Sequence, residues 1–345
     1  MVNGKKPTKT YIHDSRLLRS VMIFLVCLLV IVVVFRGVFA LYYNEFFSAS
    51  RQEFQIPGLS EYFVPQGMTS CGDGNYLISG YMSNTGFARI YYVNALGRSR
   101  AMRIMEADGT TLTSHAGGIA CGGAYTYLAG SGYCYIFQTK SLLDPATDTA
   151  EVQEAFQTGN RASFCNVQGN CLLMGEYAYG TKFQTDSAHH IVTPSGDHNT
   201  ALVLAFPLDD REPFGVRETP IAAYSIPERV QGMCYTDDGR MVLSASSAVG
   251  ASQLYLYDYG AAVSGRRGIY WENGEPISLY YLDSSNCTKI IHLPPYSEEV
   301  MFDAHKLYVL FESASKRFQF GRLVGADFVY SMELPDWKPD GALEL

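Results

Sequence analysis

The sequence predicts an all-β protein, a β-propeller preceded by one transmembrane helix. The segment Val64-Pro65-Gln66-Gly67-Met68-Thr69 returns 165 residues later as Arg229-Val230-Gln231-Gly232-Met233-Cys234. Each copy comes shortly before an apolar run typical of a strand, and a motif that recurs within one domain marks a repeated supersecondary unit. The chain after residue 50 divides into units of four such strands, and helix signals are few.

Five units follow one another, each with a turn after its first strand, such as Gly72-Asp73-Gly74. The innermost strands are expected at 66–71, 115–121 and 163–167, from Gln231 onward, and at 299–303. The fourth unit carries an insert, residues 259–288, in which Ile277–Leu282 resembles an extra strand. Each unit is expected to form one blade.

The last unit is one strand short, whereas a spare strand stands at the start of the domain. Glu53–Pro57 matches the fourth strands ending at Pro227 and Pro294, so we expect it to complete the last blade and close the ring. Such closure leaves only short sheet edges. The sequence favours five blades; six blades, or a pair of β-sandwiches, remain alternatives.

The N-terminus combines a basic tail with a long apolar run. Residues 1–19 contain five basic residues and one acid, and Val21–Phe35 carries no charge. We expect a cytoplasmic tail at 1–19, a signal-anchor helix at 20–43, a linker at 44–50 and an extracytoplasmic propeller at 51–345. This predicts a single-pass type II protein of the cell membrane. A cleaved signal peptide, with small residues Val38 and Ala40 before Leu41, is the alternative.

The net charge argues against one class of partner, and the cysteine spacings argue against one kind of metal site. Residues 44–345 hold 20 Lys and Arg against 33 Asp and Glu, a net charge of −13. A nucleic-acid partner is not expected, because phosphates require a basic face. Seven cysteines follow the membrane segment, and their spacings form no metal knuckle. Disulfides and buried single thiols both remain open.

The four-strand repeat, the two Gln-Gly-Met segments and Ser114-His115-Ala116-Gly117-Gly118 resemble the superfamily of exported β-propellers that includes quinoprotein-like and lactonase- or paraoxonase-like proteins. The resemblance covers residues 51–334 and identifies no subfamily. Lactonase-type members bind calcium at the axis through Glu, Asn and Asp. Because the corresponding positions here include Gln66, His115, Ser163, Gln231 and Glu299, the resemblance does not imply a calcium site.

In antiparallel blades, the start of each innermost strand and the end of the next strand lie on one face. We call it the front face, and the polar side chains that converge there are the predicted site. The predicted ligand-binding residues are Gln66, Arg161, Ser163, Tyr177, Gln231, Glu298, Glu299 and Arg317.

Three of the front-face residues are candidates for acid/base catalysis. Glu176 and Glu312 each end an apolar strand, where partial burial raises the pKa of a carboxyl group. His115 lies on the neighbouring rim. The alternative is that these carboxylates pair with Arg161, Arg229 or Arg317 and hold the blades in register. No nucleophile elbow, P-loop or dinucleotide motif occurs in the sequence.

The long loop 178–199 offers His189, His190 and His198 as ligands for a divalent metal ion, with simple solvent exposure as the alternative. Two functions follow from these patterns. The first is a membrane-anchored binding module for a glycan, peptide, small ligand or protein partner. The second is a metal-assisted or acid/base hydrolase of an ester, lactone or glycan-like substrate.

Overall fold

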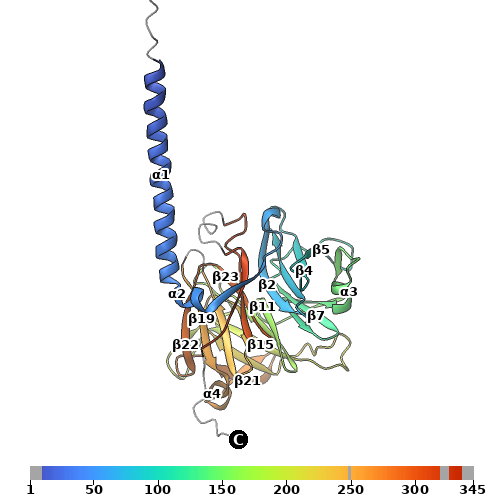
Figure 1. Ribbon diagram of the computed structural model, residues 1–345. Coiled ribbons are helices and arrows are strands. Elements are labelled where there is room, and N and C mark those ends of the chain that lie inside the picture. The colour runs from blue at the N-terminus through green and yellow to red at the C-terminus, as the bar shows by residue number, and fades with distance from the viewer. Residues whose placement is uncertain (1–9, 248–249, 319–325, 336–345) are drawn as a thin grey trace, which may run out of the picture. The chain divides into compact units, whose positions relative to one another are not determined.

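The computed structural model describes residues 10–247, 250–318 and 326–335 (Figure 1). The chain divides into two compact units, Met1–Asn44 and Glu45–Leu345. The first contains helix α1, Thr10–Tyr42, whose segment Arg16–Tyr42 is long and apolar enough to cross a membrane. A short helix α2, Asn44–Ala49, follows it.

The second unit is a five-bladed propeller, as the sequence predicts. The five innermost strands are β2 Phe63–Ser70, β6 Ile119–Gly122, β11 Ala162–Gln168, β17 Val230–Tyr235 and β23 Ser297–Asp303. The second strands are β3 Tyr76–Met82, β7 Tyr125–Gly130, β12 Cys171–Glu176, β18 Arg240–Ala245 and β24 Lys306–Phe311.

The outer strands complete the blades. The third strands are β4 Ala88–Val93, β8 Tyr133–Gln138, β15 Ala201–Pro207, β19 Ser252–Asp258 and β25 Phe328–Met332. The fourth strands are β5 Ser99–Met105, β10 Glu154–Gln157, β16 Ala222–Ile226, β22 Cys287–Leu293 and β1 Ser50–Gln55. Strand β1 pairs antiparallel with β25, so the predicted ring closure is confirmed.

Five apolar clusters fill the five joins between neighbouring blades. One example packs Leu77 and Ile90 of blade 1 against Leu128 of blade 2, and another packs Val300 of blade 5 against Val242 of blade 4. Each blade is therefore buried on both faces, which is why its strands read as continuous apolar runs rather than alternating ones. The closed ring of five clusters rules out the six-bladed and sandwich alternatives.

The insert of the fourth unit forms strands, but not in the fourth blade. Helix α4, Tyr259–Ser264, leads into a hairpin of β20 Gly268–Glu272 and β21 Glu275–Tyr281, which confirms a strand at the predicted place. Strand β21 pairs in parallel with β16, the outer strand of blade 3. The hairpin thereby pairs main-chain groups of an edge that would otherwise face solvent.

The remaining elements are short. Strand β9, Thr149–Glu151, pairs in parallel with β5 of blade 1, directly before β10 of blade 2. The others are η1 Leu59–Glu61, α3 Thr139–Leu143, η2 Ser187–His189, β13 Ile191–Val192 and β14 His198–Asn199.

Glycines let the innermost strands approach one another at the axis. A Cβ added at Gly67 would lie 2.4 Å from the carbonyl oxygen of Gly117, and one at Gly117 would lie 1.7 Å from that of Ser163. At Gly232 it would lie 2.3 Å from Oε1 of Glu299. The repeated glycines therefore serve close backbone packing, as a strand glycine commonly does.

Candidate functional site

The site begins with an irregularity shared by four innermost strands. The antiparallel register shifts between Pro65 and Gly67, between Ala162 and Phe164, between Val230 and Gly232, and between Ser297 and Val300. A β-bulge leaves a residue out of the ladder and re-aims its side chain. The residues within these shifts are Gln66, Ser163, Gln231, Glu298 and Glu299, all of them predicted ligand-binding positions.

Two of these residues carry the repeated motif, and each donates to a carboxyl group. Nε2 of Gln66 donates to Oε2 of Glu312 at 2.9 Å. Nε2 of Gln231 donates to Oε1 of Glu298 at 3.2 Å. Glu298 and Glu312 are also hydrogen-bonded to each other. The Gln-Gly-Met echo thus places one amide beside each member of a carboxyl pair, which we call the axial glutamate pair.

Burial governs the protonation of the axial glutamate pair. Glu298 is 2% exposed and Glu312 is 9% exposed. Burial, and then the neighbouring charge of Glu312, raise the pKa of Glu298 well above its ordinary value. Burial raises the pKa of Glu312 to about 8, although the bonds from Glu298 and Gln66 and the charge of Arg317 oppose this rise. Both groups are therefore largely protonated at neutral pH, with Glu298 as the donor of the bond between them and Glu312 as the member that loses its proton near pH 8.

Tyr81, His115 and Arg317 lie together beside the pair. Nη1 of Arg317 donates to the Tyr81 hydroxyl at 2.7 Å, and the rings of Tyr81 and His115 stack with centroids 4.6 Å apart. Burial and the charge of Glu312 raise the pKa of Tyr81, so its hydroxyl stays protonated. Surrounding protein and the Arg317 charge lower the pKa of His115, whose ring remains exposed on one side. A neutral imidazole can accept a hydrogen bond from a ligand.

Tyr177 approaches the pair from blade 3. Its hydroxyl donates to the carbonyl of Ser246 at 3.3 Å. Burial raises the pKa of Tyr177, and the charges of Glu298 and Glu312 add to this rise. Tyr177 thus belongs to the same electrostatic neighbourhood as the axial glutamate pair.

The arginines largely bond elsewhere. Arg229 pairs with Glu228 at 2.7 Å, and Nη1 of Arg161 donates to the carbonyl of Gln184 at 3.0 Å. Ser163 donates to the carbonyl of Arg161 at 2.9 Å. Of the three arginines offered as ion-pair partners, Arg317 acts on Glu312 through its charge while its hydrogen bond goes to Tyr81. Among the described residues, no arginine forms an ion pair within 4.0 Å with Glu176 or Glu312, the two candidate catalytic carboxyl groups.

Glu299 is buried but points into the join between blades 4 and 5. Its Oε1 accepts from the backbone N–H of Met233 at 3.2 Å and of Val300 at 3.1 Å, and burial raises its pKa well above the ordinary value. Its Oε2 has no hydrogen-bond partner among the described residues. A neutral carboxyl group held by two backbone N–H groups fits a packing role rather than ligand contact.

Glu176 lies in a separate network. Its Oε1 accepts from Nδ1 of His189 at 2.6 Å and from the Leu202 N–H at 3.0 Å, and its Oε2 accepts from the Arg161 N–H at 3.2 Å. Nε2 of His189 lies 3.0 Å from the Tyr270 hydroxyl of the inserted hairpin. Sequence reasoning placed Glu176 with Glu312 and His115, whereas its recorded partners all belong to blade 3 and to the hairpin docked on it.

The three predicted metal ligands do not converge. Both ring nitrogens of His189 are engaged with Glu176 and Tyr270, His190 Nε2 lies 3.1 Å from the Thr185 hydroxyl, and His198 lies in β14. Among the residues described, no group of three or more His, Cys, Asp or Glu side chains is arranged to hold a metal ion. The metal prediction thus has no supporting geometry in this part of the chain.

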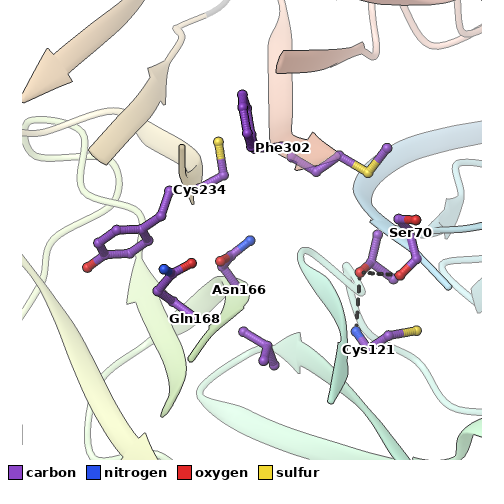
Figure 2. A pocket seen from close by; sticks show the side chains of 10 residues that line it. Ser70, Cys121, Asn166, Gln168, Cys234 and Phe302 are labelled. Atoms are coloured by element: carbon purple, nitrogen blue, oxygen red, sulfur yellow. Dashed lines mark hydrogen bonds between the residues drawn. The ribbon is translucent and has the colours of Figure 1, made fainter. Parts of the chain in front are cut away.

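The opposite, rear face holds a cavity of about 160 Å³ that sequence reasoning did not identify. It is lined where innermost strands end, by residues that include Ser70, Cys121, Asn166, Gln168, Cys234 and Phe302 (Figure 2). A second cavity, of about 550 Å³, lies beside Tyr255, Tyr257 and Leu282. The sequence signal that could have located the first cavity is the set of residues at the ends of the innermost strands, which lie on the face opposite their Gln-Gly-Met starts.

No protein-family model and no curated protein matches the chain. Among similar solved structures is a PQQ-bound aldose sugar dehydrogenase from Streptomyces coelicolor, with 16% identity, a TM-score of 0.45, and coverage of 82% of this chain and 96% of that one. Another is a putative oxidoreductase (glucose dehydrogenase) from Thermus thermophilus, with 12% identity, a TM-score of 0.42, and coverage of 82% and 99%. Both TM-scores are below 0.5, and these likenesses identify no family for the chain.

Proposed function

We propose that the chain is a membrane-anchored binding module whose propeller lies outside the cytoplasm and binds a polyhydroxylated ligand, such as a glycan, on its front face. The observation that carries the proposal is the axial glutamate pair, held by Gln66 and Gln231. A protonated carboxyl group can both donate and accept hydrogen bonds, which matches the hydroxyl groups of a sugar.

The groups around the pair support the same ligand class. Tyr81 offers a protonated hydroxyl and His115 offers one exposed ring face for stacking. Arg317 is exposed and provides a cation. Aromatic faces, hydroxyls and one charged group fix the orientation of a polar ligand more strongly than they fix that of an apolar one.

Ligand binding is tested with the full chain in detergent micelles on a glycan array. We expect wild type to retain a subset of glycans and Glu312→Gln to reduce affinity for them at least tenfold, because the carboxyl O–H of Glu312 is lost. Glu151→Gln, an exposed glutamate on β9, is the matched control and should bind as wild type does. Absence of glycan binding, or equal binding by Glu312→Gln, would refute the proposal.

The placement of the propeller needs its own measurement. We propose a single-pass type II arrangement, with the basic tail in the cytoplasm and α1 as the anchor. Protease added to intact cells should remove the propeller while sparing a tag fused to residue 1. Protection of the propeller would refute this orientation.

A second candidate function is acid/base hydrolysis, favoured by the carboxyl group whose pKa is about 8 beside a protonated partner. The direct bond between Glu298 and Glu312 leaves no room for a glycosidic bond between them, unlike the wider spacing of paired glycosidase carboxylates. Once the pH rises through about 8, the pair loses its first proton, and the resulting carboxylate can activate a water molecule.

Hydrolysis is tested with chromogenic esters, lactones and glycosides. Turnover that disappears in both Glu298→Gln and Glu312→Gln, while each variant stays folded, would support a hydrolase. Elemental analysis of the purified chain addresses the metal-assisted form. Failure of the whole panel would leave binding as the function of the front face.

A further inference from the structure

Cys71 and Cys121 lie side by side on the rear face of the propeller. Cys71 directly follows β2 of blade 1 and Cys121 lies in β6 of blade 2. Their Sγ atoms are 2.8 Å apart, and both residues are half-buried. Unbonded heavy atoms pack at about 3.5–4.0 Å, whereas the sulfurs of a disulfide lie about 2.05 Å apart. The two sulfurs are thus closer than packing alone allows.

The backbones that carry these cysteines are held together independently of the sulfurs. The Cys121 N–H donates to the Thr69 hydroxyl at 3.2 Å, and Gly67 of β2 packs directly against Gly117 and Gly118. A bond between the sulfurs therefore requires a side-chain adjustment of less than about 1 Å and no rearrangement of the blades.

We propose that Cys71 and Cys121 form a disulfide that fastens blade 1 to blade 2. The inference rests on the proposed extracytoplasmic position of the propeller, since disulfides persist in oxidising compartments. Strand β6 is the shortest innermost strand, with 4 residues against 8 in β2. The bond would fasten this short strand to blade 1. It lies between blades 1 and 2, whereas β1 closes the ring between blades 5 and 1.

The chemistry balances with a protein disulfide as oxidant. The bond from Cys71, then those from Thr126 and Thr69, lower the pKa of Cys121, whereas the pKa of Cys71 is raised. Cys121 is therefore the attacking thiolate and forms a mixed disulfide with the oxidant. Cys71 then loses its proton and attacks the Cys121 sulfur, and the oxidant sulfur bound to Cys121 leaves. The two cysteines give up two electrons and two protons, and the oxidant becomes a dithiol.

The other cysteines are poorer candidates. Cys134, Cys165 and Cys234 are buried, and burial is the first cause that raises the pKa of each thiol. Cys171 and Cys287 are half-buried. Neither has a cysteine sulfur recorded as a contact within the described residues. The pairing is thus specific to two of the seven cysteines beyond the membrane segment.

The test uses the full chain isolated from membranes in the presence of N-ethylmaleimide, which blocks free thiols. Tryptic digestion without reduction should yield peptide 52–89 joined to peptide 104–140, with a mass two hydrogens below the sum of the two peptides plus one N-ethylmaleimide on Cys134. Because peptide 104–140 also contains Cys134, the cross-link should persist in Cys134→Ser and vanish in Cys121→Ser. Cys171→Ser is the matched control and should keep it.

A second arm separates the disulfide from the location of the propeller. Purified, fully reduced chain is incubated with oxidised glutathione, and the Cys71–Cys121 link should re-form and raise the melting temperature by about 5–10 °C. Maleimide on both cysteines in membrane-derived chain, with no link after glutathione, would overturn the disulfide. Maleimide on both, with the link re-forming in vitro, would keep the pairing and refute the extracytoplasmic position.

Discussion

Two second strands lead to a buried glutamate, Glu176 as the last residue of β12 and Glu312 directly after β24, and the surroundings of the two differ. Glu176 is met by an imidazole and two backbone N–H groups. Glu312 is met by Gln66 and by another carboxyl group. Burial alone therefore does not determine a role: the oxygens of Glu176 face an imidazole and two N–H donors, whereas Glu312 faces a second carboxyl group.

The largest expected difference is in stability. Removing Glu176 leaves His189 and two backbone N–H groups buried without their acceptor, so Glu176→Ala should lower the free energy of unfolding by about 3 kcal/mol. At pH 5, where Glu312 is protonated in the folded state, Glu312→Gln removes one of two adjacent buried acids and should change this free energy by less than about 1 kcal/mol. Urea denaturation followed by intrinsic fluorescence measures both. Equal losses would remove the distinction between the two glutamates.

The next largest expected effect of Glu312 is on the pH dependence of the free energy of unfolding. Folding raises the pKa of Glu312 from its ordinary value to about 8, so the folded state binds a proton that the unfolded state has released. Stability contributed in this way is complete below the ordinary glutamate pKa and is lost as the pH rises through about 8.

In the wild type, the free energy of unfolding should fall between pH 5 and 8, and release of up to one proton from Glu312 contributes about 1.4 kcal/mol per pH unit to this slope. Glu312→Gln should remove that contribution and make the slope shallower. Unfolding free energies across this range provide the measurement, with Glu151→Gln as the exposed control. An unchanged slope would show that Glu312 is ionised in the folded protein.

A smaller effect concerns the repeated glutamines. Gln66 donates to Glu312 and lowers its pKa, so Gln66→Leu should raise that pKa by about 1. Gln231→Leu is the matched control, because Gln231 donates to Glu298 and not to Glu312. Carboxyl carbon chemical shifts of labelled glutamate report the titration. A larger response to Gln231→Leu would reverse the assignment of proton donor and acceptor.

The smallest effect is on His115. The charge of Arg317 contributes to the lowered pKa of His115, so Arg317→Gln should shift that pKa upward by a small amount. Both side chains are exposed, and salt should therefore screen the effect. Histidine ring shifts measured at low and high salt test this. A change in the pKa of His115 that does not depend on ionic strength would instead indicate altered packing where His115 stacks on Tyr81.

Sequence reasoning succeeded where a signal was periodic. The five blades, the closure by β1 and the front-face position of Gln66 and Gln231 all follow from the repeat and from strand direction. It grouped Glu176 with Glu312 because both end apolar strands, and it read the loop 178–199 as a metal site because its histidines are close in sequence. Side-chain partners decide such cases, and they come from distant segments such as the hairpin that carries Tyr270.

The sequence by itself determined the architecture, because four-strand units with a repeated start can bury their apolar faces only against one another. Only the tertiary structure decided that Gln66 meets Glu312, 246 residues away, and that Gln231 meets Glu298. The physical reason is that a bulge turns each side chain toward the axis, where neighbours come from other blades. Protonation depends on those neighbours, and no local pattern encodes them.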